Sequence, residues 1–349
     1  MPRSDPGPGS ASLVSVIVVN YNGADALPRC LDALTSDTDD ASTEVLVVDN
    51  ASSDGSDAIA EEAAGRNESV RLLRSPTNRG YAGAVNLALA EARGAYVAVL
   101  NMDLVVSPGW LDPLISFLEA RPDAGAACPL IVLESDPGRI NAAGQNVHVT
   151  ALGFNRWLEE PRERAGNQPF RVSGLHGAAF LVRRDDLEAI GGWDESGFLY
   201  HEDVELSWLL TLAGKEIHCV PASTVSHDYH LTMFPHKLFL LERNRWSMLL
   251  ANTGRLTRLA LSPLLALSEL MMWGYCLLRG PAFLRAKLDS YRWISTHRER
   301  IRERRRFVDS VRRRSDWGVL RRMHWGYPVD QFVTLGRERG ESERNRIGS

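Results

Sequence analysis

Short apolar runs rich in valine and isoleucine alternate with helix-like stretches along the first hundred residues, and this alternation constrains the fold most strongly. The runs are "VSVIVVN" (14–20), "EVLVVDN" (44–50), "VRLLRS" (70–75) and "AYVAVLN" (95–101). Continuous β-branched runs of this length are typical of strands buried on both faces. Strands separated by helices predict a mostly parallel sheet with helices on both faces, and therefore an α/β fold.

Polar residues stand where these predicted strands end. In an open parallel sheet, ligands bind outside the carboxyl ends of the strands. Those ends carry Tyr21, Asp49, and the pair Asn101 and Asp103 in "LNMD". An amide and a carboxylate after a buried strand can begin a solvated turn, or they can hold a metal ion and a phosphate. The convergence of such residues at several strand ends favours a binding site.

Length and composition allow one large domain with an appendage. The 349 residues are 44% hydrophobic and 24% charged, with a net charge of −4 that argues neither for nor against nucleic acid. The four cysteines form no CxxC pair and are expected to be reduced core thiols of a cytoplasmic protein. We expect a disordered Pro/Gly/Ser-rich segment over residues 1–11, a catalytic domain over 12–232 and a helical, basic extension over 233–349.

The extension begins with an apolar stretch. Twenty residues between Arg258 and Arg279 are broken only by Pro263 and Glu269, and residues 297–314 then hold nine arginines against three acids. A spanning helix needs about 20 predominantly apolar residues, which this stretch barely reaches. An apolar helix followed by a basic one predicts attachment to an anionic inner leaflet. The alternative is a helical hairpin that packs on the catalytic domain with a solvated basic face.

Seven motifs in sequence order resemble glycosyltransferase family 2, whose members are inverting transferases of the GT-A fold. They are "VSVIVVNYN", "VLVVDNASSDGS", "NRGYAGAVN", "LNMD", "HGAAFLVRR", "GGWDESGFLYHEDVELSWLL" and "SHDYH". Each motif alone is weak, but seven in this order carry the resemblance over roughly residues 13–230. It is strongest for the rhamnosyltransferase-like branch.

The resemblance implies that Val19, Tyr21 and Asp49 line a uracil or thymine pocket. The Tyr21 ring offers a face for a nucleobase, and Asp49 can accept hydrogen bonds from a ribose hydroxyl or a base N–H. For Asp49, the alternative is an ordinary turn into the following helix.

The motif "NRGYAGAVN" predicts a helix start that can meet an anion. Asn78 and Gly80 would present backbone N–H groups and Arg79 a positive charge, while Asn86 matches the family's second asparagine. The alternative is an ordinary cap with a glycine for close packing. By resemblance, Trp193 of "GGWDE" packs against the donor or acceptor sugar; otherwise it is a core aromatic.

The "LNMD" motif corresponds to the family's DxD, which implies a divalent cation, Mg²⁺ or Mn²⁺. Such a cation prefers oxygen ligands and bridges the phosphates of a nucleoside diphosphate. Asn101 replaces the first carboxylate, so Asp103 is the expected ligand, while Asn101 would bond the ribose or ligate weakly. His227 of "SHDYH" stands where metal-dependent relatives place a histidine ligand, with His230 as the second choice.

The acids of "YHEDVELSW" are the expected catalytic groups. The resemblance makes Asp203 the general base that takes the acceptor hydroxyl's proton, with Glu202 as the fallback and Glu205 as a solvated or ion-paired residue. A partly desolvated carboxylate is competent for this role. The alternative is that the acids only favour the first turn of a helix.

The resemblance implies an inverting glycosyltransferase. We expect it to be non-processive, because "ERNRW" (242–246) has glutamate where processive relatives have the glutamine of QxxRW, and because the sequence predicts no multi-span membrane channel. The expected donor is dTDP-L-rhamnose or a UDP-sugar. The expected acceptor is lipid-linked or a glycan, in surface polysaccharide, cell-wall or glycoprotein glycan synthesis at the cytoplasmic membrane face. Nucleic acid is not an expected partner.

Two alternatives remain at this stage. A sugar-phosphate nucleotidyltransferase needs a Gly-rich loop with Arg and Lys after the first strand, and "NYNGADALP" lacks one. A degenerate transferase that acts as a membrane scaffold is favoured by Asn101, whereas Glu202, Asp203 and His227 count against it.

Overall fold

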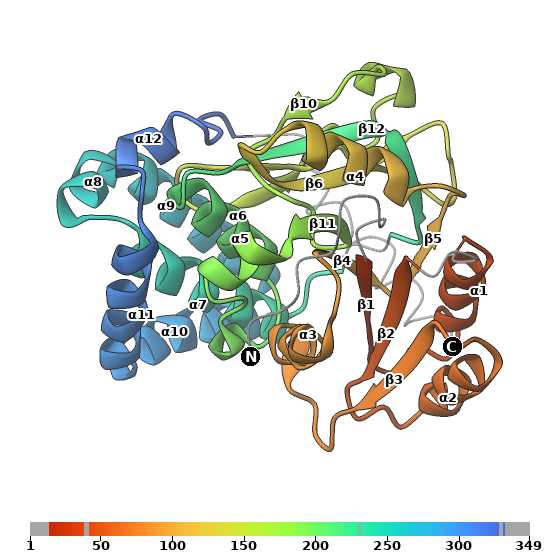
Figure 1. Ribbon diagram of the computed structural model, residues 1–349. Coiled ribbons are helices and arrows are strands. Elements are labelled where there is room, and N and C mark those ends of the chain that lie inside the picture. The colour runs from red at the N-terminus through yellow and green to blue at the C-terminus, as the bar shows by residue number, and fades with distance from the viewer. Residues whose placement is uncertain (1–13, 38–41, 230–231, 328–330, 332–349) are drawn as a thin grey trace.

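One mixed sheet organises the residues that the computed structural model describes, 14–37, 42–229, 232–327 and 331 (Figure 1). The predicted disordered segment 1–11 and His230 lie outside the described residues. Within the described residues ten strands join the sheet, in the order β10-β12-β6-β11-β4-β1-β2-β3, with β5 beside β12 and β7 beside β6. Their bounds are β1 Val14–Asn20, β2 Thr43–Asp49, β3 Val70–Arg74, β4 Tyr96–Asn101, β5 Leu104–Val106, β6 Ala124–Leu133, β7 Ile140–Ala142, β10 Phe170–Arg171, β11 Ala179–Arg183 and β12 Glu216–His227.

The N-terminal strands are parallel, as the sequence predicts. Strands β3, β2, β1 and β4 lie side by side with the same direction. In this register Asn20 lies opposite Asp49, and Val19 lies opposite Asn101. The polar strand ends therefore meet at one edge of the sheet.

The second half of the sheet brings a late segment of the chain to this edge. Strand β11 runs antiparallel between β4 and β6, while β12 runs parallel to β6 and antiparallel to β5. Because His227 pairs with Leu104, the "SHDYH" motif lies directly beside the residue that follows Asp103. A small separate hairpin is formed by β8 (Gln145–Val147) and β9 (Gly153–Asn155).

Helices cover both faces of the sheet. Alternate residues of β1 divide between the two faces, so Val16 and Val18 pack with α1, α2 and α4, whereas Ile17 and Val19 pack with α3 and α6. The bounds are α1 Leu27–Asp37, α2 Ser56–Arg66, α3 Gly80–Glu91, α4 Leu111–Ala120, α5 Arg184–Ala189 and α6 Glu202–Leu212, with short 3₁₀ turns η1 Arg162–Ala165 and η2 Glu195–Gly197.

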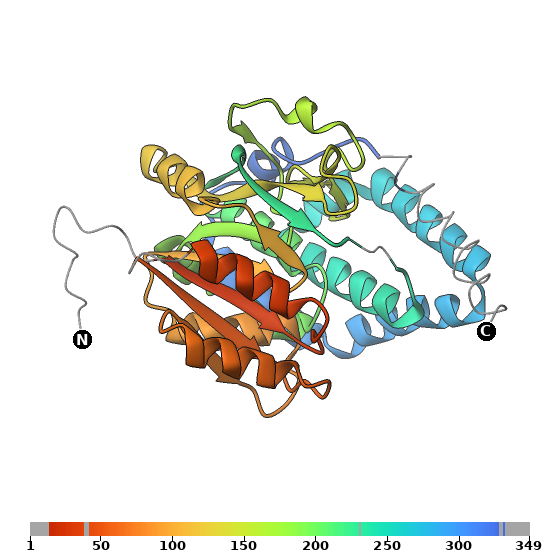
Figure 2. The ribbon, with the colours of Figure 1, turned by 90° about the vertical axis from the view of Figure 1, so that its right-hand side faces the viewer.

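Residues 235–320 form a helical layer beside the α6 side of the sheet (Figure 2). No helix of the described residues is long and apolar enough to cross a bilayer. The helices are α7 Pro235–Asn252, α8 Arg255–Ala260, α9 Ser262–Arg279, α10 Pro281–Thr296, α11 Arg298–Val311 and α12 Asp316–Leu320.

A buried ion cluster explains the glutamate in the middle of the apolar stretch. Glu269 of α9 contacts Lys287 of α10 at 2.8 Å and also pairs with Arg245 of α7. Glu242 of α7 bonds Arg245 at 2.8 Å and pairs with Lys287 as well. Two acids and two bases thus balance one another and join three helices, because an unpaired buried charge would be strongly destabilising. This agrees with the alternative in which a helical hairpin packs on the catalytic domain.

The basic helix α11 is largely exposed, in agreement with the alternative of a solvated basic face, but two of its arginines pair with acids of other elements. Arg304 bonds Glu205 at 2.9 Å and lies 3.8 Å from Asp194, and Arg300 lies 3.6 Å from Asp194. These pairs fasten α11 to the catalytic domain. They also confirm Glu205 as an ion-paired residue.

Candidate active site

A cavity of about 400 Å³ lies at the carboxyl edge of the parallel strands, and we call it the His227 cavity. Strand β4 and the turn after it supply Asn101 and Asp103, the start of α6 supplies Glu202 and Asp203, and the end of β12 supplies His227. The structure therefore brings together five of the predicted residues from three distant segments. Its full lining is Tyr81, Asn101, Asp103, His176, Gly177, Ala178, Leu199, Tyr200, Glu202, Asp203, His227, Asp228 and Tyr229.

Asp103 and His227 face each other across this cavity. The His227 Nε2 atom lies 3.4 Å from Asp103 Oδ2, and Asp103 Oδ1 is buried with no hydrogen-bond partner among the described residues. On the other side of the ring, Nδ1 lies 2.9 Å from Asn141 Oδ1. Since that oxygen can only accept, Nδ1 carries the hydrogen, and the Nε2 lone pair of a neutral ring points toward Asp103. Two electron-rich atoms that face each other in this way repel unless a proton or a cation lies between them.

Asp203 is held by several hydrogen-bond donors. Its Oδ2 accepts from Gln145 Nε2 at 2.7 Å and from the backbone N–H of Gly177 at 3.0 Å, and its Oδ1 accepts from the backbone N–H of Val204 at 2.8 Å. Glu202 differs, because its Oε2 is buried and has no partner in the described part of the chain.

The two acids therefore lie in one site, but hydrogen bonds stabilise a negative charge on Asp203 more than on Glu202. Burial and the neighbouring Asp203 carboxylate raise the pKa of Glu202 from 4.5 to about 8. Burial also raises the pKa of Asp203, but its hydrogen bonds oppose this shift. Hydrogen bonds to a carboxylate favour the charged form, so Asp203 is the member that ionises first. A neutral Glu202 and an ionised Asp203 suit the expected assignment of the base.

The loop before these acids is strained. Phe198, Tyr200 and His201 have φ angles of 62°, 67° and 75°, in a region that residues with a Cβ rarely adopt. Gly80, at the start of α3, lets this loop approach closely, because a Cβ at Gly80 would lie 2.1 Å from the Phe198 carbonyl oxygen. Strain of this kind persists only where neighbouring groups hold the backbone.

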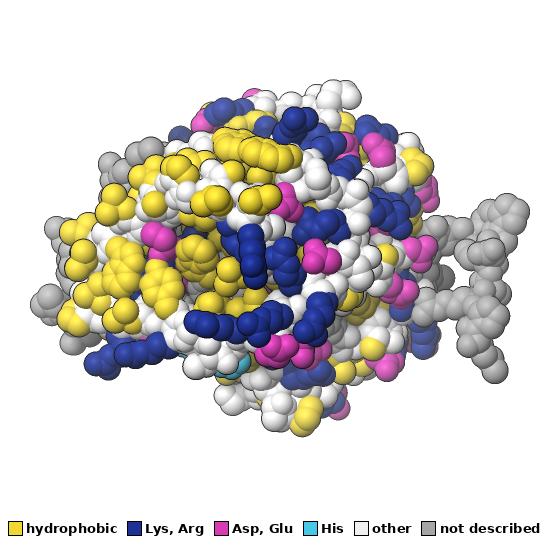
Figure 3. Space-filling view, turned by 90° about the vertical axis from the view of Figure 1, so that its left-hand side faces the viewer, with side chains coloured by type: hydrophobic (Ala, Val, Ile, Leu, Met, Phe, Trp, Pro, Cys, Tyr) yellow, Lys and Arg dark blue, Asp and Glu magenta, His cyan; other side chains and the backbone are white. Residues whose placement is uncertain are grey.

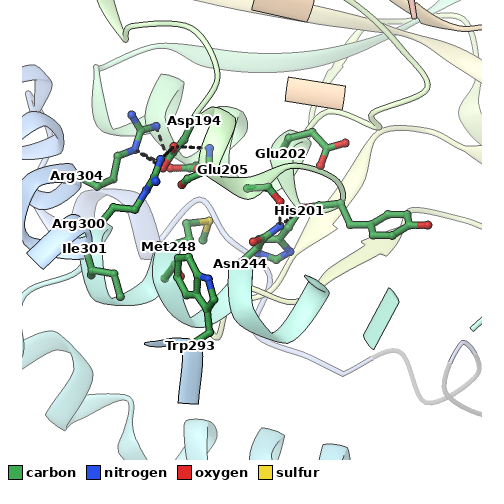
Figure 4. A pocket seen from close by; sticks show the side chains of 14 residues that line it. Asp194, His201, Glu202, Glu205, Asn244, Met248, Trp293, Arg300, Ile301 and Arg304 are labelled. Atoms are coloured by element: carbon green, nitrogen blue, oxygen red, sulfur yellow. Dashed lines mark hydrogen bonds and ion pairs between the residues drawn. The ribbon is translucent and has the colours of Figure 1, made fainter. Parts of the chain in front are cut away.

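Asn244 of α7 is the group that holds this loop. Its Nδ2 lies 2.9, 3.1 and 2.7 Å from the carbonyl oxygens of Gly197, Leu199 and Tyr200. Arg243 adds hydrogen bonds to the Ser196 carbonyl, at 3.2 Å, and to the Gly197 carbonyl, at 2.5 Å. In Figure 4, Asn244 points from α7 toward the segment that carries His201 and Glu202. The middle of "ERNRW" therefore holds the loop that leads into Glu202 and Asp203, a role that its similarity to QxxRW does not suggest.

A second cavity, which we call the Tyr21 cavity, adjoins the first through Asn101 and Asp103 and has a volume of about 320 Å³. Four of the predicted site residues, Val19, Tyr21, Asn78 and Gly80, line it, and Tyr21 is 45% exposed. Its full lining is Val19, Tyr21, Asn50, Asn78, Gly80, Tyr81, Asn101, Met102, Asp103, Phe198, Leu199, Tyr200, Phe234, His236 and Leu240.

Asn50 lines the Tyr21 cavity where Asp49 was expected. Its side chain bonds Asn78 Oδ1 at 3.0 Å and the Gly80 carbonyl at 3.1 Å, and it accepts from the Arg79 N–H at 2.9 Å. Asp49 is 5% exposed and does not line this cavity, since its oxygens accept from Asn20 and Ser52. The bond from Ser52 agrees with a turn at Asp49, and a contact between Asp49 and the nucleoside stays a prediction.

Three further predicted residues lie outside the two cavities. The Arg79 guanidinium pairs with Glu195 at 3.0 Å, and Asn86 exchanges hydrogen bonds with the backbone of Trp193 at 2.9 and 3.2 Å. Trp193 is buried in the core near Phe180. In this structure these three residues support the loop around Glu195, and a direct contact with the sugar nucleotide stays a prediction.

The family model described as "Glycosyl transferase family 2" matches residues 15–191, half of the chain. The chain belongs to this family. The match contains the four N-terminal parallel strands and the part of the Tyr21 cavity formed by residues 19–103, whereas Glu202, Asp203 and His227 lie beyond its end. The protein is therefore a nucleotide-sugar-dependent glycosyltransferase.

Similar curated proteins include an N-acetylglucosaminyl-diphospho-decaprenol L-rhamnosyltransferase of Mycobacterium tuberculosis. It is 32% identical over 237 residues, which are 62% of this chain and 76% of that protein. The O-antigen biosynthesis protein RfbC of Myxococcus xanthus is 30% identical over 224 residues, 61% of this chain and 17% of that protein.

Solved structures show the fold. A mannosyltransferase, PcManGT from Pyrobaculum calidifontis, in complex with GDP-Man and Mn²⁺ has a TM-score of 0.53 at 19% identity, covering 88% of this chain and 86% of that one. GalNAc-T7 with UDP, GalNAc and Mn²⁺ has a TM-score of 0.58 at 18% identity, covering 71% and 49%. The mixed sheet with its C-terminal helices is thus a GT-A fold, as the sequence predicts.

Proposed function

We propose that this glycosyltransferase moves a sugar, with inversion, from dTDP-L-rhamnose or a UDP-sugar to a lipid-linked acceptor in surface polysaccharide or cell-wall synthesis. The observation that carries the proposal is the His227 cavity, in which Asn101, Asp103, Glu202, Asp203 and His227 converge. The M. tuberculosis relative is named for a rhamnosyl transfer to a diphospho-decaprenol acceptor, which supports this donor and this class of acceptor.

In this proposal Asp203 is the general base. Its carboxylate takes the proton of the acceptor hydroxyl as that oxygen attacks the anomeric carbon. The new carbon–oxygen bond forms as the bond from the anomeric carbon to the diphosphate breaks, and the nucleoside diphosphate leaves from the opposite face. The hydrogen bonds from Gln145 and Gly177 fix the carboxylate, and the neutral Glu202 avoids a second negative charge beside it.

Asp103 and His227 fit a divalent cation, Mg²⁺ or Mn²⁺. The unpartnered Asp103 Oδ1 and the facing Nε2 of His227 are a suitable donor pair. No group of three or more His, Cys, Asp or Glu side chains placed for a metal occurs within the described residues, so diphosphate oxygens and water would complete the coordination. A cation bound there neutralises charge on the leaving diphosphate.

The Tyr21 cavity is the proposed site of the nucleoside. The exposed Tyr21 ring can stack on a pyrimidine, and Asn50 and Asn78 supply amide groups at the same wall. Asn101 lines both cavities and would contact the ribose or the diphosphate.

One sugar is transferred for each acceptor in this proposal. Glu242 replaces the glutamine of QxxRW and is bound with Arg245 in the buried ion cluster, which supports a structural role for this motif. Electrophoresis or mass spectrometry of the product would show a single added residue.

We also propose that the enzyme attaches peripherally to the cytoplasmic face of the membrane. Figure 3 shows the helical layer, where hydrophobic side chains gather beside a band of Lys and Arg. The leucines of α8 and α9 are the most exposed: Leu256 is 82%, Leu259 70%, Leu270 71%, Leu277 65% and Leu278 69% exposed. An apolar helical face next to cations suits an anionic lipid surface.

A panel of nucleotide-sugars tests the proposal. The purified enzyme is incubated with each donor, Mg²⁺ or Mn²⁺ and a prenyl-diphosphate-linked N-acetylglucosamine. We expect release of the nucleoside diphosphate with one donor above all others, and an anomeric configuration in the product opposite to that of the donor. Retention of configuration would contradict the role of Asp203.

A further inference from the structure

A third cavity lies on the other side of the catalytic acids and has a volume of about 350 Å³. We call it the Tyr275 cavity. It shares Tyr200, Glu202 and Asp203 with the His227 cavity. Its full lining is Gln145, Leu152, Gly153, Phe154, Asn155, Leu158, His176, Tyr200, His201, Glu202, Asp203, Val204, Tyr229, Met233, Lys237, Leu238, Leu241, Glu242, Arg245, Met272, Tyr275 and Gln331. The acids therefore stand between the proposed donor side and this cavity.

Most of the Tyr275 cavity away from the acids is apolar. One wall is α7 with Leu238 and Leu241, and another is α9 with Met272 and Tyr275. Methionine and leucine walls accommodate a flexible hydrocarbon without requiring directed hydrogen bonds. Such a lining does not suit the many hydroxyl groups of a free glycan.

The cavity also has a cation in position to meet a phosphate. Lys237 lies one turn before Leu241 on α7, and its ammonium lies 5.0 Å from the centre of the Tyr200 ring. Arg245 also lines the cavity, but Glu242 and Glu269 bind its guanidinium in the buried ion cluster. Lys237 is therefore the lining cation outside that cluster.

Helix α9 connects this cavity to the exposed leucines. Met272 and Tyr275 lie on its cavity side, whereas Leu270 and Leu277 lie about half a turn away on the exposed side. One helix, about 10 Å across, thus separates the apolar cavity from the surface proposed to face the membrane. A hydrocarbon chain that extends out of the cavity therefore has only the width of this helix to cover before it reaches lipid.

We propose that the Tyr275 cavity binds the diphosphate and the first isoprenoid units of a prenyl-linked acceptor, with Lys237 on the phosphate and Met272 and Tyr275 on the hydrocarbon. This assignment rests on the proposed function, because it places the acceptor's reactive hydroxyl beside Asp203. The lipid, and not only the sugar, is then recognised by the protein itself.

Binding of farnesyl diphosphate to the full chain, measured by calorimetry without any donor, tests this site. A lost charge-assisted contact costs about tenfold or more in affinity. We expect Lys237→Ala to weaken farnesyl diphosphate by at least about tenfold, Lys237→Arg to restore most of the affinity, and Arg292→Ala, at an exposed cation on α10, to change nothing. Met272→Asn should weaken both farnesyl diphosphate and farnesol, whereas Lys237→Ala should leave farnesol unchanged.

Two results would overturn the assignment. One is equal affinity of Lys237→Ala and the unmodified protein for farnesyl diphosphate. The other is displacement of the probe by excess dTDP or UDP, which would place it in the donor site. Hydrolysis of the donor, followed separately in the unmodified protein, keeps the two proposals apart: binding without hydrolysis would contradict the transferase mechanism alone, and hydrolysis without binding would contradict this site alone.

Discussion

Replacing Asn244 by alanine tests whether the α7 asparagine holds the catalytic loop in its strained conformation. The substitution removes hydrogen bonds to the carbonyls of Gly197, Leu199 and Tyr200. The amide has two hydrogens for these three acceptors, so at about 0.5–1.5 kcal/mol for each hydrogen it stabilises the folded state by about 1–3 kcal/mol. These hydrogen bonds oppose strain of about 1–3 kcal/mol at each left-handed residue of the loop.

Because these hydrogen bonds then no longer oppose the strain, we expect the loop to relax once Asn244 is lost. Relaxation recovers part of the lost stability, so the free energy of unfolding should fall by only about 1–2 kcal/mol. The displaced Glu202 and Asp203 should then lower kcat/KM by at least about tenfold, since 1.4 kcal/mol of barrier is tenfold in rate. Asn244→Asp should be at least as damaging, because its carboxylate would face three carbonyl oxygens.

Steady-state release of nucleoside diphosphate and thermal melting measure the two effects. Asn252→Ala is the matched control on the same helix, since the buried amide of Asn252 has no hydrogen-bond partner among the described residues. It should keep wild-type kcat/KM. A wild-type kcat/KM in Asn244→Ala would refute the claim that this residue positions the acids.

Three other predictions follow from the site and the surface. Glu202 holds its proton up to about pH 8 in the folded protein but only to about pH 4.5 when unfolded, so the free energy of unfolding should fall as the pH rises between these values. Thermal melts of Glu202→Gln should show a flatter dependence on pH, and an unchanged dependence would contradict the pKa assignment. Asp103→Ala and His227→Ala should each weaken Mn²⁺ binding, measured by electron paramagnetic resonance with dTDP present, by about tenfold or more, and chelation should abolish activity; wild-type binding in both variants would contradict the cation site. The double variant Leu270→Ser and Leu277→Ser should sediment less with anionic vesicles at low salt, whereas equal sedimentation would contradict the proposed membrane face.

The sequence predicts the parallel half of the sheet because its strands are continuous apolar runs whose pattern is local. It also predicts that Tyr21, Asn101 and Asp103 lie at one edge, since strand ends in such a sheet share that edge, whereas His227 is expected there from the family resemblance alone. It does not predict which residues hold the side chains of the site in place. Asn141 and Gln145 lie in an irregular segment, and their contacts with His227 and Asp203 depend on residues 86 and 58 positions away.

Two residues show that one residue type suits two environments. Asp49 ends β2 and Asn50 follows it, and Asn50 is the one of the two that lines the Tyr21 cavity. Glu269 appears in the sequence as a break in an apolar stretch, whereas in the structure it pairs with Arg245 and Lys287. Such long-range pairs leave no local pattern.

The most direct test of the account compares the unmodified enzyme with Asp203→Ala for nucleotide-sugar turnover, with a prenyl-linked acceptor and Mn²⁺. The account predicts that Asp203→Ala lowers kcat by about 10²–10⁴-fold, the usual contribution of a general base, with little change in the KM for the donor. Glu205→Gln, outside the cavity, serves as the comparison and should retain far more activity. Equal turnover by Asp203→Ala and the unmodified enzyme would contradict the assignment of the active site.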